Sequence, residues 1–279
     1  MTLLKVSDHN RDFAGMTYVY PVLSRRAGGV SVGINLNPNN ACNWHCVYCQ
    51  VPNLVRGAAP AIDRDVLRKE LSGFLTALME GDYMQEHVPE GLRTIKDIAF
   101  SGNGEPTSAG EFADIVSDVL AIRDAAGLTS VPVRLITNGS LIKRSAVQEG
   151  LRRLAAGGGE VWFKVDGGRR EDIARINGVD LDPASVSRAL AKSAELCPTW
   201  VQTCMFAWDG EAPNEAAIDA YLETLSAAGI DALEGVLLYG VVRASMQPEA
   251  VRVSALDETG LLLIAERIKE KGLTVRVSP

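Results

Sequence analysis

The chain has 279 residues, of which 47% are apolar, so it is long enough for two average domains or for one α/β barrel. Its formal net charge of −7 argues against broad non-specific binding to nucleic acid or to an anionic membrane surface. No apolar run reaches the ~18 residues of a membrane span and no secretory apolar region follows Met1, so we expect a cytoplasmic protein.

The first part of the chain is expected to lead into a strand. Residues 1–29 predict an irregular leader, followed by one barrel domain over residues 30–279. Within the leader, Arg25 and Arg26 are either a solvated pair or candidates for contact with a carboxylate or phosphate. Between residues 30 and 36, apolar residues alternate with polar ones and glycine, which predicts a half-polar strand.

That strand runs directly into a cluster of cysteines. Cys42, Cys46 and Cys49 are spaced C-x3-C-x2-C, and Tyr48 stands just before the third. Three close thiolates can hold three irons of a cubane [4Fe–4S] cluster and leave the fourth iron open. A zinc site with His45 as fourth ligand and simple packing of small apolar cysteines are the alternatives. The segment is too polar for a core, and no second pair of zinc ligands appears in the chain, so the pattern favours the cluster.

Strands and helices alternate along the rest of the chain. Strands are predicted at 95–101, 131–137, 160–166, 200–208 and 232–241, and a short terminal strand at 274–277. Helices are predicted at about 63–80, 111–126, 143–156, 183–196, 214–228 and 261–271. Together with residues 30–36, this gives six strands each followed by a helix, which predicts an α/β fold with a parallel sheet and right-handed crossovers. Functional residues in such barrels gather at the C-terminal ends of the strands.

One such strand end carries the loop Gly102-Asn103-Gly104-Glu105. The loop lacks the third glycine of a dinucleotide-binding turn, and the chain contains no Walker A sequence. Its glycines would let the backbone approach a ligand closely. The alternative is a plain turn with a solvated Glu105.

Three further strand ends place polar residues toward the lumen. Alternation puts Lys164 and Asp166 on the inward face of their strand, where they pair with each other or bind a ligand. Asn138 and Gln202 are also expected to face inward. The alternatives are that Asn138 is only a turn residue and that Gln202 only makes hydrogen bonds within the protein. Cys204 shares the face of Gln202 and is expected to be a packed thiol.

The cysteine spacing and the strand ends resemble the radical S-adenosylmethionine (SAM) superfamily, which has a partial (β/α)6 barrel. The resemblance implies that a [4Fe–4S] cluster on the three cysteines reductively cleaves SAM to a 5′-deoxyadenosyl radical. It also implies that Tyr48 lies against the adenine and that residues 102–105 bind the SAM amino group. Asn138 would lie near the ribose and carboxylate, and Gln202 would line the cofactor site. A flavodoxin or ferredoxin is the implied electron donor.

The resemblance extends to one branch of that superfamily. The segments around residues 21–26, 34–42, 202–203 and 238–243 look like those of wybutosine-type tRNA-modifying enzymes. Those enzymes carry extra N-terminal cysteines for a second cluster, whereas this chain has no cysteine before Cys42. An enzyme acting on an unidentified substrate is therefore expected, and a tRNA-modifying enzyme or a non-catalytic iron–sulfur carrier or sensor remains as an alternative.

Overall fold

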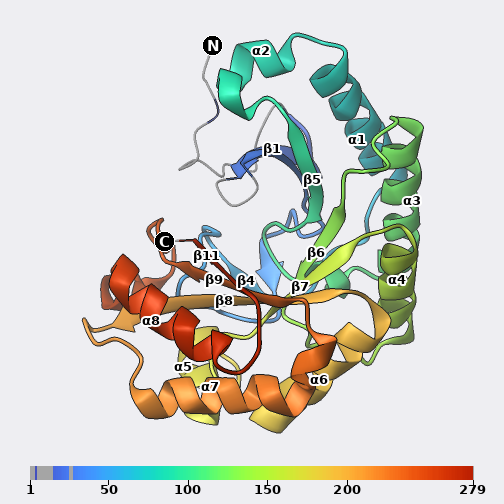
Figure 1. The fold of residues 1–279 in the computed structure, drawn as a ribbon. Helices are drawn as coiled ribbons and strands as arrows, with labels where there is room; N and C mark the ends of the chain where they lie inside the picture. Colours follow the sequence, from blue (N-terminus) through green and yellow to red (C-terminus); the bar gives the residue numbers. More distant parts are fainter. Residues whose placement is uncertain (1–3, 5–14, 25–27, 279) are drawn as a thin grey trace.

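The computed structural model describes residue 4, residues 15–24 and residues 28–278, and its main sheet curls into a half-barrel (Figure 1). The strands of this sheet are β1 (Val19–Ser24), β2 (Gly29–Ile34), β5 (Ile95–Phe100), β6 (Val133–Thr137), β7 (Glu160–Lys164), β8 (Thr199–Trp208), β9 (Gly235–Gly240), β10 (Val253–Ala255) and β11 (Val275–Ser278). Their spatial order is β1-β2-β5-β6-β7-β8-β9-β11, with β10 attached to β8. Two short strands, β3 (Ala41–Cys42) and β4 (Val55–Arg56), pair separately.

The parallel part of the sheet is the predicted partial (β/α)6 barrel. β2, β5, β6, β7, β8 and β9 are joined by parallel pairing, and β11 adds the predicted terminal strand beside β9. β1 pairs antiparallel with β2, so β1 and β11 form the two edges of the curled sheet. The prediction of fold class is therefore confirmed.

Helices cover the outer, convex face of the sheet (Figure 1). They are α1 (Arg64–Met79), α2 (Tyr83–His87), α3 (Phe112–Ala125), α4 (Ser145–Ala156), α5 (Arg170–Asn177), α6 (Pro183–Leu196), α7 (Glu215–Ala228) and α8 (Glu258–Lys269). Short 3-10 turns lie at Glu90–Leu92, Pro106–Ser108, Ile230–Ala232 and Pro248–Arg252. Side chains of Asp63, Asp182, Asn214 and Asp257 cap the starts of α1, α6, α7 and α8 by accepting backbone N–H bonds. In the described part of the chain, no helix is both long and apolar enough to cross a membrane.

Strand alternation separates the core from the lumen as predicted. Val161, Phe163 and Val165 are buried in the core between sheet and helices. Trp162 and Lys164 point the other way and line a cavity inside the half-barrel. The helices therefore bury one face of each strand and leave the other face for polar side chains.

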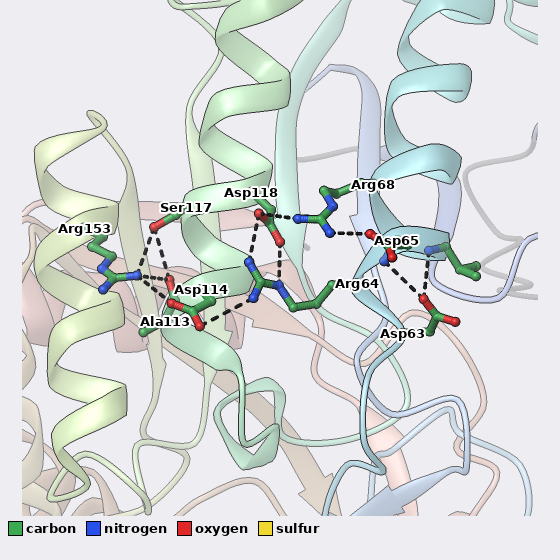
Figure 2. Close-up of polar contacts among 10 residues, drawn as sticks. Asp63, Arg64, Asp65, Arg68, Ala113, Asp114, Ser117, Asp118 and Arg153 are labelled. Atoms are coloured by element: carbon green, nitrogen blue, oxygen red, sulfur yellow. Dashed lines mark hydrogen bonds and ion pairs between the residues drawn. The ribbon is translucent and has the colours of Figure 1, made fainter.

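Ion pairs tie the outer helices together (Figure 2). Arg64 of α1 binds both carboxylate oxygens of Asp118 of α3, at 2.8 and 3.0 Å. Arg153 of α4 reaches back to α3, where it contacts Asp114 at 3.0 Å. These side chains are at least partly exposed, so the network adds little stability beyond the apolar packing beneath it.

Several elements differ from the sequence-based prediction. The leader contains β1, so the prediction of irregular structure is wrong for residues 19–24, while Arg25 and Arg26 lie outside the described residues. The short helices α2 and α5 and the short strand β10 were also not predicted. β10 packs antiparallel on the end of β8, and α5 follows the turn after β7.

Candidate functional site

A cavity of roughly 320 Å³ opens at the C-terminal ends of the parallel strands. Its walls come from both edges of the sheet, since Tyr20 of β1 and Ser278 of β11 both line it. The three cysteines Cys42, Cys46 and Cys49, which we call the cysteine motif, line the same cavity. The structure therefore brings the motif to one place with residues 102–105, Asn138, Lys164 and Gln202, whereas Asp166 lies outside this cavity.

The cysteine motif occupies a loop that is held from two sides. From the segment after β9, the Ser245 hydroxyl donates to the Val47 carbonyl at 2.7 Å, and the Met246 N–H donates to the Cys49 carbonyl at 2.9 Å. From α5, the carbonyls of Ile176 and Asn177 accept the N–H groups of Val47 and His45, both at 2.9 Å. The loop has almost no regular structure of its own, so these contacts fix its course.

Burial dominates the electrostatics of two motif thiols, those of Cys42 and Cys46. Burial raises the pKa of Cys42 to about 11 and that of Cys46 to about 12. Lys164 opposes the rise at Cys46, and the Trp44 N–H, 3.4 Å from Cys42 Sγ, opposes it at Cys42. With no iron bound, the Cys42 and Cys46 thiols are therefore neutral at pH 7, and ligation of iron has to displace their protons.

The donor set fits an iron–sulfur cluster better than zinc with His45. The His45 ring lies 3.5 Å from the Glu249 carboxylate and does not line the cavity that the three cysteines share. Among the described residues, no three His, Cys, Asp or Glu side chains converge as ligands of one metal ion do. A cubane needs three thiolates on three different irons, and three thiols facing one cavity meet that need.

The loop after β5 packs tightly against the cysteine segment. A Cβ at Gly104 would lie 2.0 Å from the Ala41 carbonyl oxygen. A Cβ at Gly102, which has a φ of 143°, would lie 2.4 Å from Asn35 Oδ1. Both glycines are thus required by neighbouring protein atoms, while the loop still lines the cavity together with Asn103.

Glu105 is buried and is not a solvated turn residue. Its carboxylate accepts hydrogen bonds from the Thr107 N–H at 3.1 Å and the Asn138 N–H at 2.8 Å, as well as from the hydroxyls of Thr107 and Thr137. Burial raises the pKa of Glu105, and these four hydrogen bonds oppose that rise. The side chain therefore joins the ends of β5 and β6 and presents its carboxyl group at the cavity wall.

Asn138 connects the end of β6 to the cysteine segment. Its Nδ2 donates to Asn43 Oδ1 at 2.9 Å, and its Oδ1 accepts the N–H of Ser140 at 3.0 Å. The Ser140 hydroxyl in turn accepts from Asn43 Nδ2 at 2.7 Å. Asn138 lines the cavity, as predicted, and it also positions Asn43 beside Cys42.

Lys164 and Asp166 lie together but do not face the same space. The Lys164 ammonium lies in the cavity, 3.8 Å from Asp166 Oδ2 and 3.2 Å from the Tyr239 hydroxyl. Asp166 is fully buried behind Tyr48, whose hydroxyl donates to it, and lines a separate small cavity. Burial lowers the pKa of Lys164, but the Asp166 carboxylate and neighbouring groups outweigh this effect and raise it, so the lysine stays charged.

Tyr48 and Gln202 also line the cavity, and so does Cys204, which was expected only to be a packed thiol. The Tyr48 ring lies 4.8 Å from the Lys164 ammonium, so the predicted adenine-facing residue also stabilises a cation. Gln202 is paired in register with Lys164 and is 3% exposed, and its side chain makes no hydrogen bond within the described chain. Cys204 is buried, and burial raises the pKa of its thiol well above the usual range.

Sequence reasoning missed several residues that build the site. Asn35 supplies Oδ1 to the backbone N–H groups of Asn37 and Asn103, and Asn37 Nδ2 donates to the Ala41 carbonyl at 2.9 Å. At the opposite end of the cavity, Arg134 forms ion pairs with Asp97 and Glu160 across three strands. Alternation in residues 30–36 marked Asn35 as polar, but no pattern in the sequence pointed to its two backbone partners.

Comparison with known proteins identifies a matching family and similar sequences. A family model described as the radical SAM superfamily matches residues 36–222. The chain is 30% identical over 134 residues to a protein named GTPase Obg from Brachyspira hyodysenteriae, and 31% identical over 147 residues to a UPF0026 protein from Methanocaldococcus jannaschii. These matches cover 47% and 52% of this chain, but only 17% and 39% of the two relatives.

The fold has a counterpart among solved structures. A radical SAM methyltransferase from Sphaerobacter thermophilus superposes with a TM-score of 0.63 at 12% identity, over 92% of this chain and 68% of that one. At that identity the likeness concerns the fold. The family match covers more than half of the chain and includes the cysteine motif, so this protein belongs to the radical SAM superfamily.

Proposed function

We propose that this protein is an enzyme that holds a [4Fe–4S] cluster on Cys42, Cys46 and Cys49 and binds SAM beside it, acting on an unidentified substrate. The observation that carries the proposal is the shared cavity, because the cysteine motif and the loop of residues 102–105 come from different strand ends and line one space. A non-catalytic iron–sulfur electron carrier or sensor needs the cysteines but does not need a second, ligand-sized site beside them.

When bound, the reduced cluster and SAM supply the chemistry, which is one-electron cleavage of SAM and hydrogen abstraction from the substrate by the 5′-deoxyadenosyl radical. The protein binds and orients these groups. Glu105 offers a buried anion for the SAM ammonium, and Tyr48 offers a ring for the adenine. Backbone atoms at Gly102, Asn103 and Gly104 form the adjoining wall.

Lys164 and Gln202 have hydrogen-bonding capacity directed at the cavity. In the described chain the Lys164 ammonium makes one hydrogen bond, although it has three donors, and the Gln202 amide makes none. Their Cα atoms are partners across β7 and β8, so both groups face one part of the cavity. We assign these two residues to SAM or substrate, while Asp166 acts through them by holding the charge of Lys164.

The half-barrel encloses the reacting groups and limits access of water. The Trp162 ring and the apolar residues around it close part of the cavity wall. A flavodoxin- or ferredoxin-type protein would supply the electron. The net charge of −7 gives no support for tRNA as substrate, since extended phosphate contacts require basic surface.

The proposal is tested by anaerobic reconstitution with iron and sulfide, followed by electron paramagnetic resonance of the reduced protein with and without SAM. We expect about four irons per chain and a spectrum that changes when SAM is added. A loaded cluster whose spectrum is unchanged at saturating SAM would instead indicate a carrier or sensor.

A further inference from the structure

The C-terminal end of α5 packs directly onto the cysteine motif. The last carbonyls of a helix lack partners within the helix, and here two of them accept N–H groups from His45 and Val47. Gly178 ends the helix at a φ of 65°, and a Cβ at this position would lie 2.8 Å from the His45 carbonyl oxygen. The close approach therefore depends on this glycine.

The last residue of that helix, Asn177, directs its side-chain amide at the motif. Asn177 is 1% exposed, and its Nδ2 lies 3.3 Å from Cys46 Sγ and 2.8 Å from Asp166 Oδ2. An amide nitrogen has two hydrogens, so both contacts are made at once. The Asp166 carboxylate accepts only, which fixes the orientation in which the nitrogen, not the oxygen, faces Cys46 and Asp166.

A hydrogen bond from an amide to a cysteine sulfur has a redox consequence when that sulfur ligates iron. Reduction adds negative charge to the cluster and its thiolates, and an N–H directed at a thiolate stabilises the more negative state more strongly. The contact at Cys46 Sγ therefore raises the reduction potential and makes the cluster easier to reduce. The bond of Asn177 to Asp166 holds the amide in the orientation that this effect requires.

We propose that Asn177 is a positioning residue that orients Cys46 and raises the reduction potential of the cluster held there. The inference rests on the proposed function, because it requires a cluster on Cys46. It adds a residue from α5, more than 120 positions from the motif, to the machinery that controls electron entry.

The test compares Asn177→Leu, which keeps a similar volume and removes the donor, with a matched control. Ser245→Ala is that control, because the Ser245 hydroxyl donates to the Val47 and Cys49 carbonyls of the same loop and accepts the Gln247 N–H, but it makes no hydrogen bond to a sulfur. Iron and sulfide content is measured first, and the potential is then followed by electron paramagnetic resonance. We expect Asn177→Leu to shift the one-electron equilibrium at least tenfold toward the oxidised cluster, which is about 59 mV. Ser245→Ala should keep the wild-type potential.

An unchanged potential in a fully loaded Asn177→Leu protein would overturn the inference, as would equal shifts in both variants. Wild-type protein that takes up no cluster would overturn the proposed function itself. If Asn177→Leu fails to load, wild-type protein with 15N in its asparagine side chains gives the answer. The inference predicts a weak 15N coupling to the cluster, and the absence of this coupling would refute the contact. The coupling would not come from Asn43, because the side-chain nitrogen of Asn43 is directed at Ser140.

Discussion

Replacing Glu105 separates its structural role from its role toward SAM. Glu105→Ala leaves the buried N–H groups of Thr107 and Asn138 without their acceptor. Each unpaired buried donor costs about 1–3 kcal/mol, so the free energy of unfolding should fall by about 2–6 kcal/mol. Glu105→Gln keeps the volume and one acceptor oxygen, so its loss of stability should be smaller.

The two variants should differ less in SAM binding. Both lack the carboxylate that would contact the SAM ammonium, a charge-assisted bond worth roughly 1.5–3 kcal/mol. We therefore expect about ten- to hundredfold weaker SAM binding by cluster-loaded Glu105→Gln, measured by calorimetry. Wild-type affinity in a loaded Glu105→Gln protein would refute the assignment of this carboxylate to SAM, and wild-type stability in Glu105→Ala would refute its structural role.

Glu105 should also give stability a pH dependence. Burial raises its folded-state pKa above the unfolded value near 4.5, so the folded protein retains a proton that the unfolded chain has lost. The stability that Glu105 contributes is therefore present below the unfolded pKa and is lost as the pH rises through the folded pKa. Denaturant unfolding of cofactor-free protein should show this loss in the wild type but not in Glu105→Gln, and parallel pH profiles would contradict it.

Three further predictions concern the motif, the lumen and nucleic acid. Changing any cysteine of the motif to alanine should abolish the brown cluster absorption, whereas Cys197→Ala or Cys204→Ala should keep it. Full iron and sulfide content in all three motif variants would refute the ligand assignment. Lys164→Met should lower the free energy of unfolding by less than the ~3–5 kcal/mol lost when a buried charge has no partner, because Asp166 still accepts three other hydrogen bonds. The same variant should lower 5′-deoxyadenosine formation. The pair would instead be structural if Lys164→Met and Asp166→Leu each lost much stability and the double variant regained it while remaining active. Bulk tRNA should bind weakly and with a steep salt dependence in filter binding, and tight binding at physiological salt would restore the tRNA-modifying alternative.

Much of the barrel was predictable because each strand alternates and ends at a recognisable turn. Alternation correctly assigned Val161 and Phe163 to the core and Lys164 to the lumen. It also placed Asp166 in the lumen, but β7 ends at Lys164, and beyond a strand the period of two no longer applies. Asp166 consequently turns toward Tyr48 and Asn177, which only the tertiary structure shows.

The missed elements have local explanations. β1 contains Pro21, which a central strand does not tolerate, but β1 is an edge strand where the missing N–H is harmless. The helix α5 is short and strongly charged, so it gives little apolar periodicity. Asn177-Gly178 was a helix-ending signal in the sequence, although nothing there indicated that the Asn177 amide reaches Cys46.

The central claim is that this chain cleaves SAM reductively, and the most direct measurement is 5′-deoxyadenosine formation. Protein reconstituted anaerobically with iron and sulfide is mixed with dithionite and SAM, and the products are quantified beside an equally treated Cys46→Ala control. The account predicts 5′-deoxyadenosine in the wild type and none above background in the control. A fully loaded wild-type protein that forms no more of it than Cys46→Ala would contradict the account.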